Sequence, residues 1–465
     1  MLWKYIEEKM NCHPDSRISE DAVSFTYQEA VDFAKQFADR LDGICYAILC
    51  RSELFAALAI LSCIAAGVTF VPISYRYGRK HCERILETVH PDFVITDILG
   101  ELSVSALDDG TYQEPQEERP AAILCTSGTT GTPKGVMLSR RNLLTNIADI
   151  HRYFAIDSAD TILIARPVYH CAVLTGEFFI SLCRGVNISF YSEGLNPALL
   201  LQKIKKENIT VLCGTPTMFM ALTQFGRRAA ACSTLRTIVL SGECLDTVRA
   251  KAIEKAFPGA KIYHVYGLTE ASPRVAYLPP DLFAVRGDWA GYPLHSVELR
   301  VVDRRGNPAA PGETGELCVR GNSVMMGYYN DPAATAAVLR GGWLHTGDMA
   351  VMEPNGLVKI RGRKDNMIIR GGMNIYPQEI EKNLSQDIRV REVMAYGIPD
   401  AFSGEKIGLR IAGDFTSRDQ VLRLCQRMLL PYQMPSVVEL VDALPKNGSG
   451  KIVRVKTIRR GRDNA

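Results

Sequence analysis

Short apolar runs rich in β-branched residues alternate along this chain with segments whose apolar residues recur at helical spacing. The runs that predict buried strands are CYAILC (45–50), DFVIT (92–96), AAILC (121–125), NISFY (187–191), TVLCG (210–214) and RTIVLSG (236–242). In the intervening segment 139–154, apolar residues share one helix face and Ser139 can act as the N-cap. This alternation predicts an α/β fold, a large domain of parallel sheets covered by helices.

The pattern changes after about residue 285, where shorter strand candidates are separated by Gly and Pro turns. The segments SVELRVVD, GELCVRG and GLVKIRGR predict a mostly β subdomain similar to a small barrel. Asp331 and Pro332 offer a capping carboxylate and a first-turn proline, so we expect a short helix over DPAATAAVL. Residues 361–384 then run from strand through a polar junction and a glycine turn to a helix, and the remaining residues suffice for a small α+β unit.

The segment from Leu54 to Ile73 contains no charged residue and approaches the length of a membrane span. Gly67 and Pro72 interrupt it, so LFAALAILSCIAAG followed by VTFVPI is better explained as buried helix, turn and buried strand. We therefore expect part of a soluble core and no stable membrane insertion.

The composition is that of an ordinary globular protein with room for two or more domains. Of the 465 residues, 47% are hydrophobic and 23% are charged, and the net charge of +3 predicts no nucleic-acid partner. The short basic stretch 459–462 is explained by a solvated end. The thirteen cysteines form no C-x-x-C pair and no cluster at zinc spacing, and MLWKYIEEKM lacks an apolar signal core. Reduced thiols in the cytoplasm are the simplest expectation.

Residues 126–135, TSGTTGTPKG, suit the binding of phosphate. They do not fit the nucleotide loop G-x-x-x-x-G-K-[ST], because Lys134 follows Pro133 and precedes Gly135. Glycine nevertheless lets backbone N–H groups turn toward one anion, and hydroxyl and ammonium groups can donate to it. The groups that could bind a triphosphate are Thr126, Ser127, Gly128, Thr129, Thr130, Thr132 and Lys134. A flexible surface turn is the alternative.

Four later segments also carry groups that suit a nucleotide. In YHVYGLTEAS, Tyr266 could stack on a base, Gly267 allows close backbone approach, and Thr269 and Glu270 could serve phosphate and Mg²⁺. In GGWLHTGDMA, Asp348 follows a tight turn and could accept both ribose hydroxyls.

The other two segments are IRGRKDNMII, whose Arg363 could reach ribose or phosphate, and LPKNGSGKIVR, a second glycine-rich loop that presents Lys451. Each segment alone also fits an ordinary surface loop.

Together and in this order, the motifs TSGTTGTPKG, YGLTE, TGD, GRKD and PKNGSGK resemble the adenylate-forming superfamily of acyl-CoA synthetases, peptide-synthetase adenylation domains and luciferases. The resemblance is strongest to small acyl- or aryl-CoA ligases and begins with VSFTYQEA (23–30) and AAGVTFVPIS (65–74). It implies an ATP- and acyl-binding domain over residues 1–362, a hinge over 363–365 and a mobile C-terminal lid domain over 366–465.

The resemblance also implies a role for each matching residue. The phosphates would be bound by Thr126, Ser127, Gly128, Thr129, Thr130 and Lys134; adenine by Ser241, Gly242, Glu243, Tyr266 and Gly267; and ribose by Asp348 and Arg363. Thr269 would contact the α-phosphate, Thr129 and Glu270 would hold Mg²⁺, and Lys451 would bridge the carboxylate and the α-phosphate. Asp365 matches the hinge, and Gly371 and Gly372 match the loop that lines the thiol path.

The segment RPVYHCAVLTGEFF (166–179) resembles the wall of the family's acyl pocket, with His170 as its gate. Val173 stands where the family has glycine, which suggests a narrower pocket, and Tyr169-His170 stands where enzymes for α-amino acids have Phe-Asp. The substrate-binding candidates are His170, Cys171, Val173, Glu177, Thr215, Gly267, Leu268 and Arg274. Glu177 could serve an amino group and Arg274 a second carboxylate, although either could be solvated or structurally paired. The rest of the pocket would be made apolar by Cys171, Cys213, Met218 and Phe219, which favours a medium-length fatty or an aromatic acid.

The function implied is activation of a carboxylic acid by ATP and Mg²⁺ to an acyl-adenylate, with release of pyrophosphate and transfer of the acyl group to a thiol, first of all CoA. Loading of a carrier protein's phosphopantetheine is an alternative. A non-catalytic nucleotide-binding protein of the same fold is a third hypothesis, disfavoured because Glu270, Asp348, Arg363 and Lys451 are all present. The oligomeric state is not predicted.

Overall fold

The computed structural model describes residues 1–107, 110–115, 118–126, 133–194, 196–371, 373–400, 402–445 and 452. The chain packs as two compact units. The first comprises Met1–Leu245, Arg249–Leu299 and Cys318–His345; the second comprises Asp246–Val248, Arg300–Leu317 and Thr346–Ala465. The predicted hinge at residues 363–365 lies within the second unit and stays a prediction.

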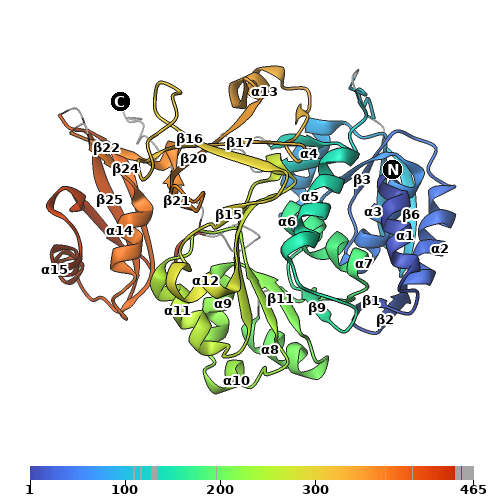
Figure 1. The fold of residues 1–465 in the computed structure, drawn as a ribbon, viewed down its shortest axis with the longest axis horizontal. Helices are drawn as coiled ribbons and strands as arrows, with labels where there is room; N and C mark the ends of the chain where they lie inside the picture. The colour runs from blue at the N-terminus through green and yellow to red at the C-terminus, as the bar shows by residue number, and fades with distance from the viewer. Residues whose placement is uncertain are drawn as a thin grey trace, which may run out of the picture. The chain divides into compact units, whose positions relative to one another are not determined.

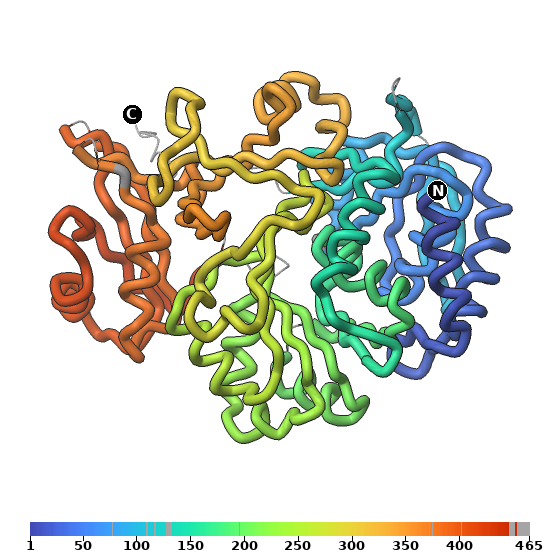
Figure 2. Tube along the Cα trace, in the orientation of Figure 1, coloured from blue at the N-terminus to red at the C-terminus, as the bar shows by residue number. Residues whose placement is uncertain are grey.

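A seven-stranded sheet in the first unit has the order β18-β8-β7-β4-β3-β5-β6. Its strands are β3 (Cys45–Ile48), β4 (Thr69–Pro72), β5 (Phe93–Ile98), β6 (Glu101–Ala106), β7 (Ala122–Thr126), β8 (Lys134–Leu138) and β18 (Gly327–Tyr328). β3, β4, β5 and β7 pair in parallel, as expected, while β6, β8 and β18 join antiparallel. Figure 2 traces the return of the chain at β18 to the sheet built by its early strands.

A nine-stranded sheet, also in the first unit, has the order β15-β14-β13-β12-β11-β9-β10-β1-β2. Its strands are β1 (Arg17–Glu20), β2 (Val23–Thr26), β9 (Thr161–Ile164), β10 (Asn187–Phe190), β11 (Val211–Gly214), β12 (Thr237–Leu240), β13 (Lys261–Gly267), β14 (Arg274–Leu278) and β15 (Tyr292–Pro293). The six strands from β1 to β13 in this order are parallel, and antiparallel strands close both edges.

Helices cover these sheets, and their ends follow local sequence signals (Figure 1). The longer ones are α1 (Leu2–Asn11), α2 (Tyr27–Ala38), α3 (Glu53–Ala66), α4 (Arg79–Val89), α5 (Arg140–Tyr153), α8 (Pro197–Lys206), α9 (Pro216–Thr223) and α11 (Thr247–Ala256). Ser139 caps α5 in a reciprocal capping box with Asn142, which confirms the predicted N-cap. Helix α3 ends at Gly67 in the left-handed conformation and leads into β4, which confirms the predicted helix, turn and strand.

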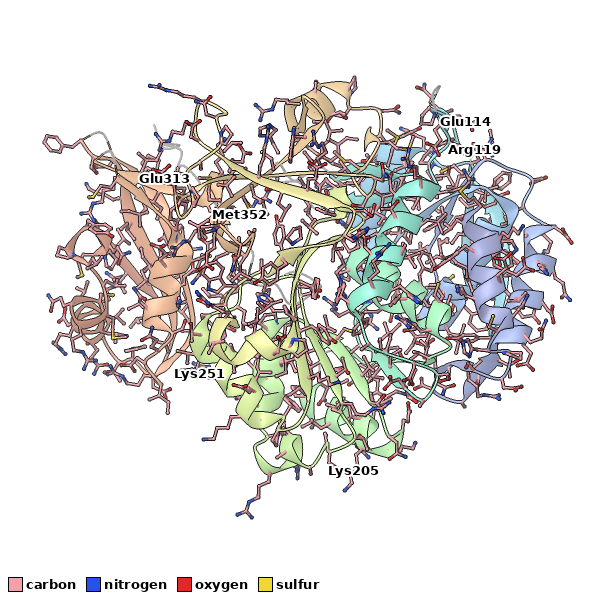
Figure 3. The ribbon with its side chains drawn as sticks, viewed as in Figure 1. Glu114, Arg119, Lys205, Lys251, Glu313 and Met352 are labelled. Atoms are coloured by element: carbon pink, nitrogen blue, oxygen red, sulfur yellow. The ribbon has the colours of Figure 1, made fainter. Side chains whose placement is uncertain are left out.

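The helices differ in how deeply they are buried. Every residue from Leu54 to Ile64 except Ala56 is buried, whereas Lys205 on α8 and Lys251 on α11 extend outward (Figure 3). In the part of the chain that the structure describes, no helix is both long and apolar enough to cross a membrane.

The β-rich region after residue 285 forms a five-stranded sheet in the order β16-β17-β20-β19, with β21 paired to β20. Its strands are β16 (Val297–Val302), β17 (Gly315–Gly321), β19 (Leu339–Arg340), β20 (Trp343–Met352) and β21 (Val358–Arg363). A barrel requires the edge strands to pair, and among the described strands β16 and β19 remain edges, so the barrel-like expectation is corrected to an open sheet. Asp331 caps α13 (Pro332–Val338) by accepting from the Ala334 N–H at 2.8 Å, as predicted.

The C-terminal residues of the second unit form the expected small α+β unit. Its sheet has the order β23-β22-β25-β24, with β26 on β25. The elements are β22 (Ile368–Arg370), β23 (Met373–Ile375), α14 (Pro377–Leu384), β24 (Val390–Asp400), β25 (Gly404–Gly413), α15 (Arg418–Met428) and β26 (Val437–Leu440). Ile380, Leu409 and Leu424 join a hydrophobic core of this region's own.

Candidate active site

The predicted phosphate loop connects two paired strands. Thr126 at the end of β7 lies opposite Lys134 at the start of β8, so the two strands pair antiparallel on either side of the predicted loop. Ser127, Gly128, Thr129, Thr130 and Thr132 lie outside the described residues. The Lys134 ammonium sits 4.9 Å from the centre of the Tyr328 ring, within cation–π range.

Glu270 lies in a single turn of 3₁₀ helix, Thr269–Ala271, directly after β13. The Tyr328 hydroxyl donates to Glu270 Oε1 at 2.9 Å, and the Met325 N–H donates to the Glu270 carbonyl at 2.9 Å. The Tyr329 N–H, one residue beyond Tyr328, donates to the Gly135 carbonyl at 2.7 Å. Tyr328 therefore joins two motifs, the phosphate-loop lysine and the YGLTE glutamate. Our reading of the sequence missed Tyr328, whose only signal was its place in the apolar run MMGYY.

Tyr266 and Gly267 end strand β13, where the pairing with β14 shifts register. A Cβ on Gly267 would lie 2.2 Å from the Pro273 carbonyl oxygen, so this position excludes any side chain. The Leu268 N–H donates to the same carbonyl at 2.9 Å and closes the turn. The close backbone approach expected of Gly267 therefore occurs within its own hairpin.

The segment Ser241–Glu243 follows β12. Gly242 has a φ of 88°, in the left-handed region that favours glycine. The Glu243 carboxylate accepts from the N–H and the hydroxyl of Thr217, and the Thr215 hydroxyl accepts from the Met218 N–H. The side chains of Glu243 and Thr215 thus bond the first turn of α9. The backbone of the 241–243 turn remains for a ligand, as does the Ser241 hydroxyl, which is buried without a hydrogen-bond partner in the described part of the chain.

Within the predicted acyl wall (166–179), Cys171–Val173 form a short helix that continues as a π-helical turn, Leu174–Phe179, a form frequent at functional sites. Val173 is fully buried and Cys171 nearly so. Burial, reinforced by the Arg166 charge, lowers the pKa of His170 to about 3, so its imidazole is neutral at physiological pH. His170 Nε2 is buried without a hydrogen-bond partner in the described part of the chain.

Glu177 and Arg274 are buried, not solvated. Arg166 Nη2 lies 2.5 Å from Glu177 Oε1, and Glu177 is completely buried. Burial raises the pKa of Glu177, while Arg166 opposes the shift. Arg274 donates to the Tyr153 hydroxyl at 2.8 Å and to the Gly176 carbonyl at 3.2 Å. Arg166 was not among the sequence candidates, although it directly precedes the PVYH segment.

Asn146 on α5 is a second residue that the sequence did not reveal. Its amide donates to the Arg274 carbonyl at 2.8 Å and accepts from the Arg274 N–H at 3.3 Å, and its side chain is fully buried. It thereby anchors the start of β14 just after the Glu270 turn.

The predicted ribose residues come together in the second unit. Asp348 and Arg363 are opposite each other on β20 and β21, with Arg363 Nη1 3.3 Å from Asp348 Oδ1. Arg363 also donates to the Thr346 carbonyl, and the Asp348 N–H donates to the Thr346 hydroxyl. Asp348 is held in place by these contacts and is 8% exposed.

The hinge and thiol-path candidates follow β21. Asp365 lies in the 3₁₀ turn Lys364–Asn366. Gly371 turns between β22 and β23 with a φ of 57°, and its N–H donates to the Ser403 carbonyl at 2.8 Å. Gly372 and Lys451 lie outside the described residues.

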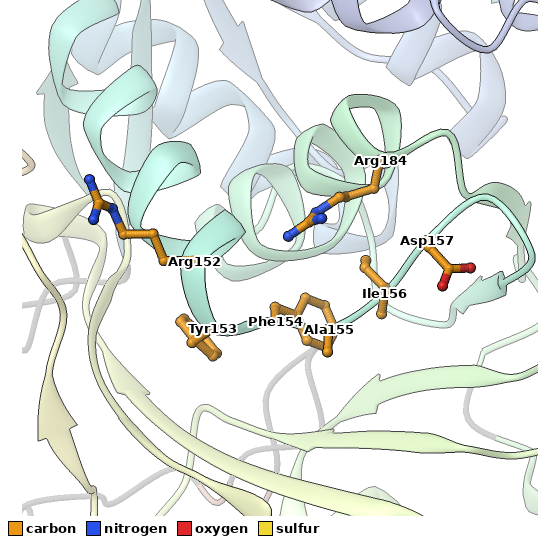
Figure 4. Close-up of a pocket in the computed structure, with 7 residues that line it drawn as sticks. All are labelled: Arg152, Tyr153, Phe154, Ala155, Ile156, Asp157 and Arg184. Carbon is orange, nitrogen blue, oxygen red and sulfur yellow. The ribbon is translucent and has the colours of Figure 1, made fainter.

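A surface hollow of about 300 Å³ lies where α5 ends (Figure 4). Its lining consists of Arg152, Tyr153, Phe154, Ala155, Ile156, Asp157 and Arg184. None of these was predicted as a site residue. Tyr153 connects the hollow to the buried Arg274.

Comparison with known families agrees with this geometry. Residues 6–329 match the AMP-binding enzyme family, and residues 379–451 match the AMP-binding enzyme C-terminal domain. The chain belongs to the AMP-binding enzyme family. This membership confirms the superfamily expected from the motifs. Its relatives are CoA synthetases, and this AMP-binding enzyme is accordingly an acid–thiol ligase.

Among curated relatives, feruloyl-CoA synthase of Amycolatopsis sp is 32% identical over 86% of this AMP-binding enzyme and 85% of its own length. The long-chain-fatty-acid–CoA ligase of Escherichia coli O157:H7 is 36% identical over 75% of this chain and 64% of its own.

Among solved structures, o-succinylbenzoate CoA synthetase from Bacillus subtilis, in complex with its acyl-adenylate intermediate, superposes with a TM-score of 0.85 at 25% identity. The superposition covers 98% of this chain and 99% of the synthetase chain, which confirms the α/β fold with a smaller C-terminal part. The same synthetase has also been solved with ATP and a magnesium ion.

Proposed function

We propose that this AMP-binding enzyme activates a fatty or aromatic carboxylic acid with ATP and transfers the acyl group from the adenylate to CoA. The observation that carries the proposal is the arrangement in which Tyr328 bonds Glu270 and supports Lys134. Tyr328 occupies Oε1 of Glu270, and Glu270 is only partly buried, so its carboxylate can accept a cation that arrives with the nucleotide.

The chemistry explains why these residue types are needed. At pH 7 a carboxylic acid is an anion, and its attack on the α-phosphorus of ATP brings two negative groups together. Lys134 and Lys451 supply positive charge, and Thr269 supplies a hydroxyl donor. Fixed donors of this kind stabilise charge that develops in the transition state. Mg²⁺ bound by Glu270 would neutralise part of the phosphate charge.

Asp348 is suited to hold the ribose. Its carboxylate is paired with Arg363 and its backbone N–H is bonded to the Thr346 hydroxyl, so little conformational freedom is lost when the carboxylate accepts two hydroxyl groups.

Two observations support a fatty or aromatic acid. Four residues predicted to line the acyl pocket, Cys171, Val173, Met218 and Phe219, are buried and apolar. The relatives include a feruloyl-CoA synthase and a long-chain-fatty-acid–CoA ligase, whose names cover both acid classes. CoA is proposed as the acceptor because these relatives are CoA enzymes, with a carrier protein's phosphopantetheine as the alternative.

A cytoplasmic location is part of the proposal. All thirteen cysteines are free thiols, and most are buried, which suits a reducing compartment.

Pyrophosphate release over a panel of acids tests the proposal. We expect release with at least one fatty or aromatic acid and none without acid. Addition of CoA, followed by mass measurement of the thioester, should give acyl-CoA and AMP. Release without a thioester on CoA, but with one on a phosphopantetheinylated carrier protein, would favour the alternative. Nucleotide binding without pyrophosphate release from any acid would contradict an enzymatic function.

A further inference from the structure

The acyl wall contains a buried charged cluster, formed by Arg166, Glu177 and Arg274 and called here the arginine cluster. Glu177 is 0% exposed, Arg274 is 1% exposed, and the Arg166 side chain is 12% exposed. Arg274 donates to the carbonyl of Gly176, the residue before Glu177, and Arg166 donates to the Glu177 carboxylate. Two guanidinium groups and one carboxylate are therefore buried around residues 176–177.

The charges in this cluster do not balance. Arg166 is paired with Glu177, whereas the two bonds from Arg274 go to neutral oxygens of Tyr153 and Gly176. Within the described residues, Glu177 is the only carboxylate paired with either guanidinium. One positive charge remains in excess, and burial of such a charge without a counterion is strongly unfavourable.

Two donor atoms and one acceptor atom in the cluster also lack partners. Nε of Arg166 and Nε of Arg274 are buried without a hydrogen-bond partner in the described part of the chain, as is Oε2 of Glu177. Buried polar groups in native proteins are nearly always bonded to protein, water or a ligand. An anion with two acceptor oxygens would satisfy the guanidinium donors, which a carboxylate does with good geometry.

The cluster lies on the segment that forms the predicted acyl wall. Glu177 is in the π-helical turn that follows His170–Val173, and Arg166 precedes His170 by four residues. A Cβ on Gly242 would lie 3.9 Å from Arg166 Nη1 and 3.8 Å from the methyl group of Thr215, a predicted substrate-binding residue, so Arg166 faces the turn predicted to border the adenine. At Gly176 a Cβ would lie 2.5 Å from Arg274 Nη2, so this glycine makes room for the guanidinium.

We propose that the arginine cluster binds a second anionic group on the acyl part of the substrate, so that the preferred acid is a dicarboxylic acid. Arg166 binds this group, Glu177 orients Arg166, and Arg274 supplies the second positive charge. This inference rests on the proposed function and adds the chemical class of the acid.

The test compares acids that differ only in the terminal group: linear mono- and dicarboxylic acids of equal chain length, and 4-methylbenzoate against terephthalate. With the full-length enzyme, ATP and Mg²⁺, we expect kcat/KM for pyrophosphate release to be at least about 10-fold higher for the best dicarboxylic acid than for its monocarboxylic partner, which corresponds to about 1.4 kcal/mol of binding. In the double variant R166Q/E177Q, which removes one charge of each sign and leaves Arg274 in place, the ratio should fall toward 1.

Arg152→Gln serves as the matched control, because Arg152 is exposed and outside the cluster; its ratio should equal that of the wild type. ATP binding by the double variant, measured by its thermal shift, establishes that the variant is folded. A wild type that prefers monocarboxylic acids, or a double variant that keeps the wild-type ratio, overturns the inference and leaves the proposed function intact. Failure of every acid in both series contradicts the proposed function, and the inference falls with it.

Discussion

The Tyr328 hydroxyl donates to Glu270 Oε1 at 2.9 Å, across 58 residues of chain. The same ring lies beneath the Lys134 ammonium, 4.9 Å from the ring centre. One aromatic side chain thus orients a carboxylate suited to Mg²⁺ and a cation suited to phosphate. The two contacts use different parts of tyrosine, the hydroxyl and the ring, so they can be removed separately.

Tyr328→Phe should raise the MgATP concentration that gives half-maximal pyrophosphate release by about 10-fold, because a hydrogen bond to a charged group is worth about 1.5–3 kcal/mol. Tyr328→Leu removes the aromatic ring as well and should weaken MgATP binding further. Steady-state kinetics at saturating acid measures both effects. Tyr329→Phe is the matched control and should leave MgATP dependence unchanged. Equal MgATP dependence in Tyr328→Phe and the wild type would exclude a role for the hydroxyl.

Lys451→Ala should slow acyl-adenylate formation by at least about 10²–10³, the usual cost of one preorganised donor to a developing charge. Single-turnover pyrophosphate release measures this step. The control Lys446→Ala, in the same glycine-rich segment, should leave the rate of acyl-adenylate formation nearly unchanged. Near-normal release by Lys451→Ala would show that another group neutralises the α-phosphate.

Asp365→Pro should impair thioester formation more than adenylation. Proline restricts the backbone at the proposed hinge, and rotation about that hinge is needed only after adenylation is complete. The two half-reactions are measured separately, as pyrophosphate release and as transfer from isolated acyl-AMP to CoA. Asp365→Ala keeps the backbone free and is the control. An equal fall in both rates in Asp365→Pro would argue against a hinge.

Glu53→Gln should change how stability depends on pH. Glu53 is 6% exposed, and Oε2 accepts from the Val168 N–H at 2.8 Å. Burial raises its pKa from 4.5 to about 7, opposed by the Val168 N–H and Arg76. The folded state therefore holds a proton that the unfolded state releases, and wild-type stability falls as pH rises from about 4.5 to about 7.

Glutamine keeps the acceptor oxygen and removes this titration. The stability of Glu53→Gln relative to wild type should therefore increase between pH 5 and pH 8, by up to about 3 kcal/mol. Urea unfolding at both pH values measures the difference, and Glu254→Gln, at an exposed position, should show none. If the stability difference between Glu53→Gln and wild type is the same at pH 5 and pH 8, the pKa of Glu53 is not raised in the folded protein.

The sequence by itself determined most secondary-structure elements and the family. Ser139 caps α5, Asp331 caps α13, and Gly67 ends α3, because caps and helical spacing depend on residues only a few positions apart. The motifs could be identified for the same reason, since each is a continuous stretch. The barrel expectation failed because closure depends on how distant strands pair, which composition does not record.

Only the tertiary structure decided which side chains meet. Tyr328 reaches Glu270, and Asn146 reaches Arg274 from 128 residues away. The pairing of Arg166 with Glu177 spans only 11 residues, yet it depends on the π-helical turn that points Glu177 inward. These partners are polar residues whose burial is possible only once the surrounding chain has packed and desolvated them together. Local pattern carries no record of that packing, so the sequence supplied the groups and the fold selected their partners.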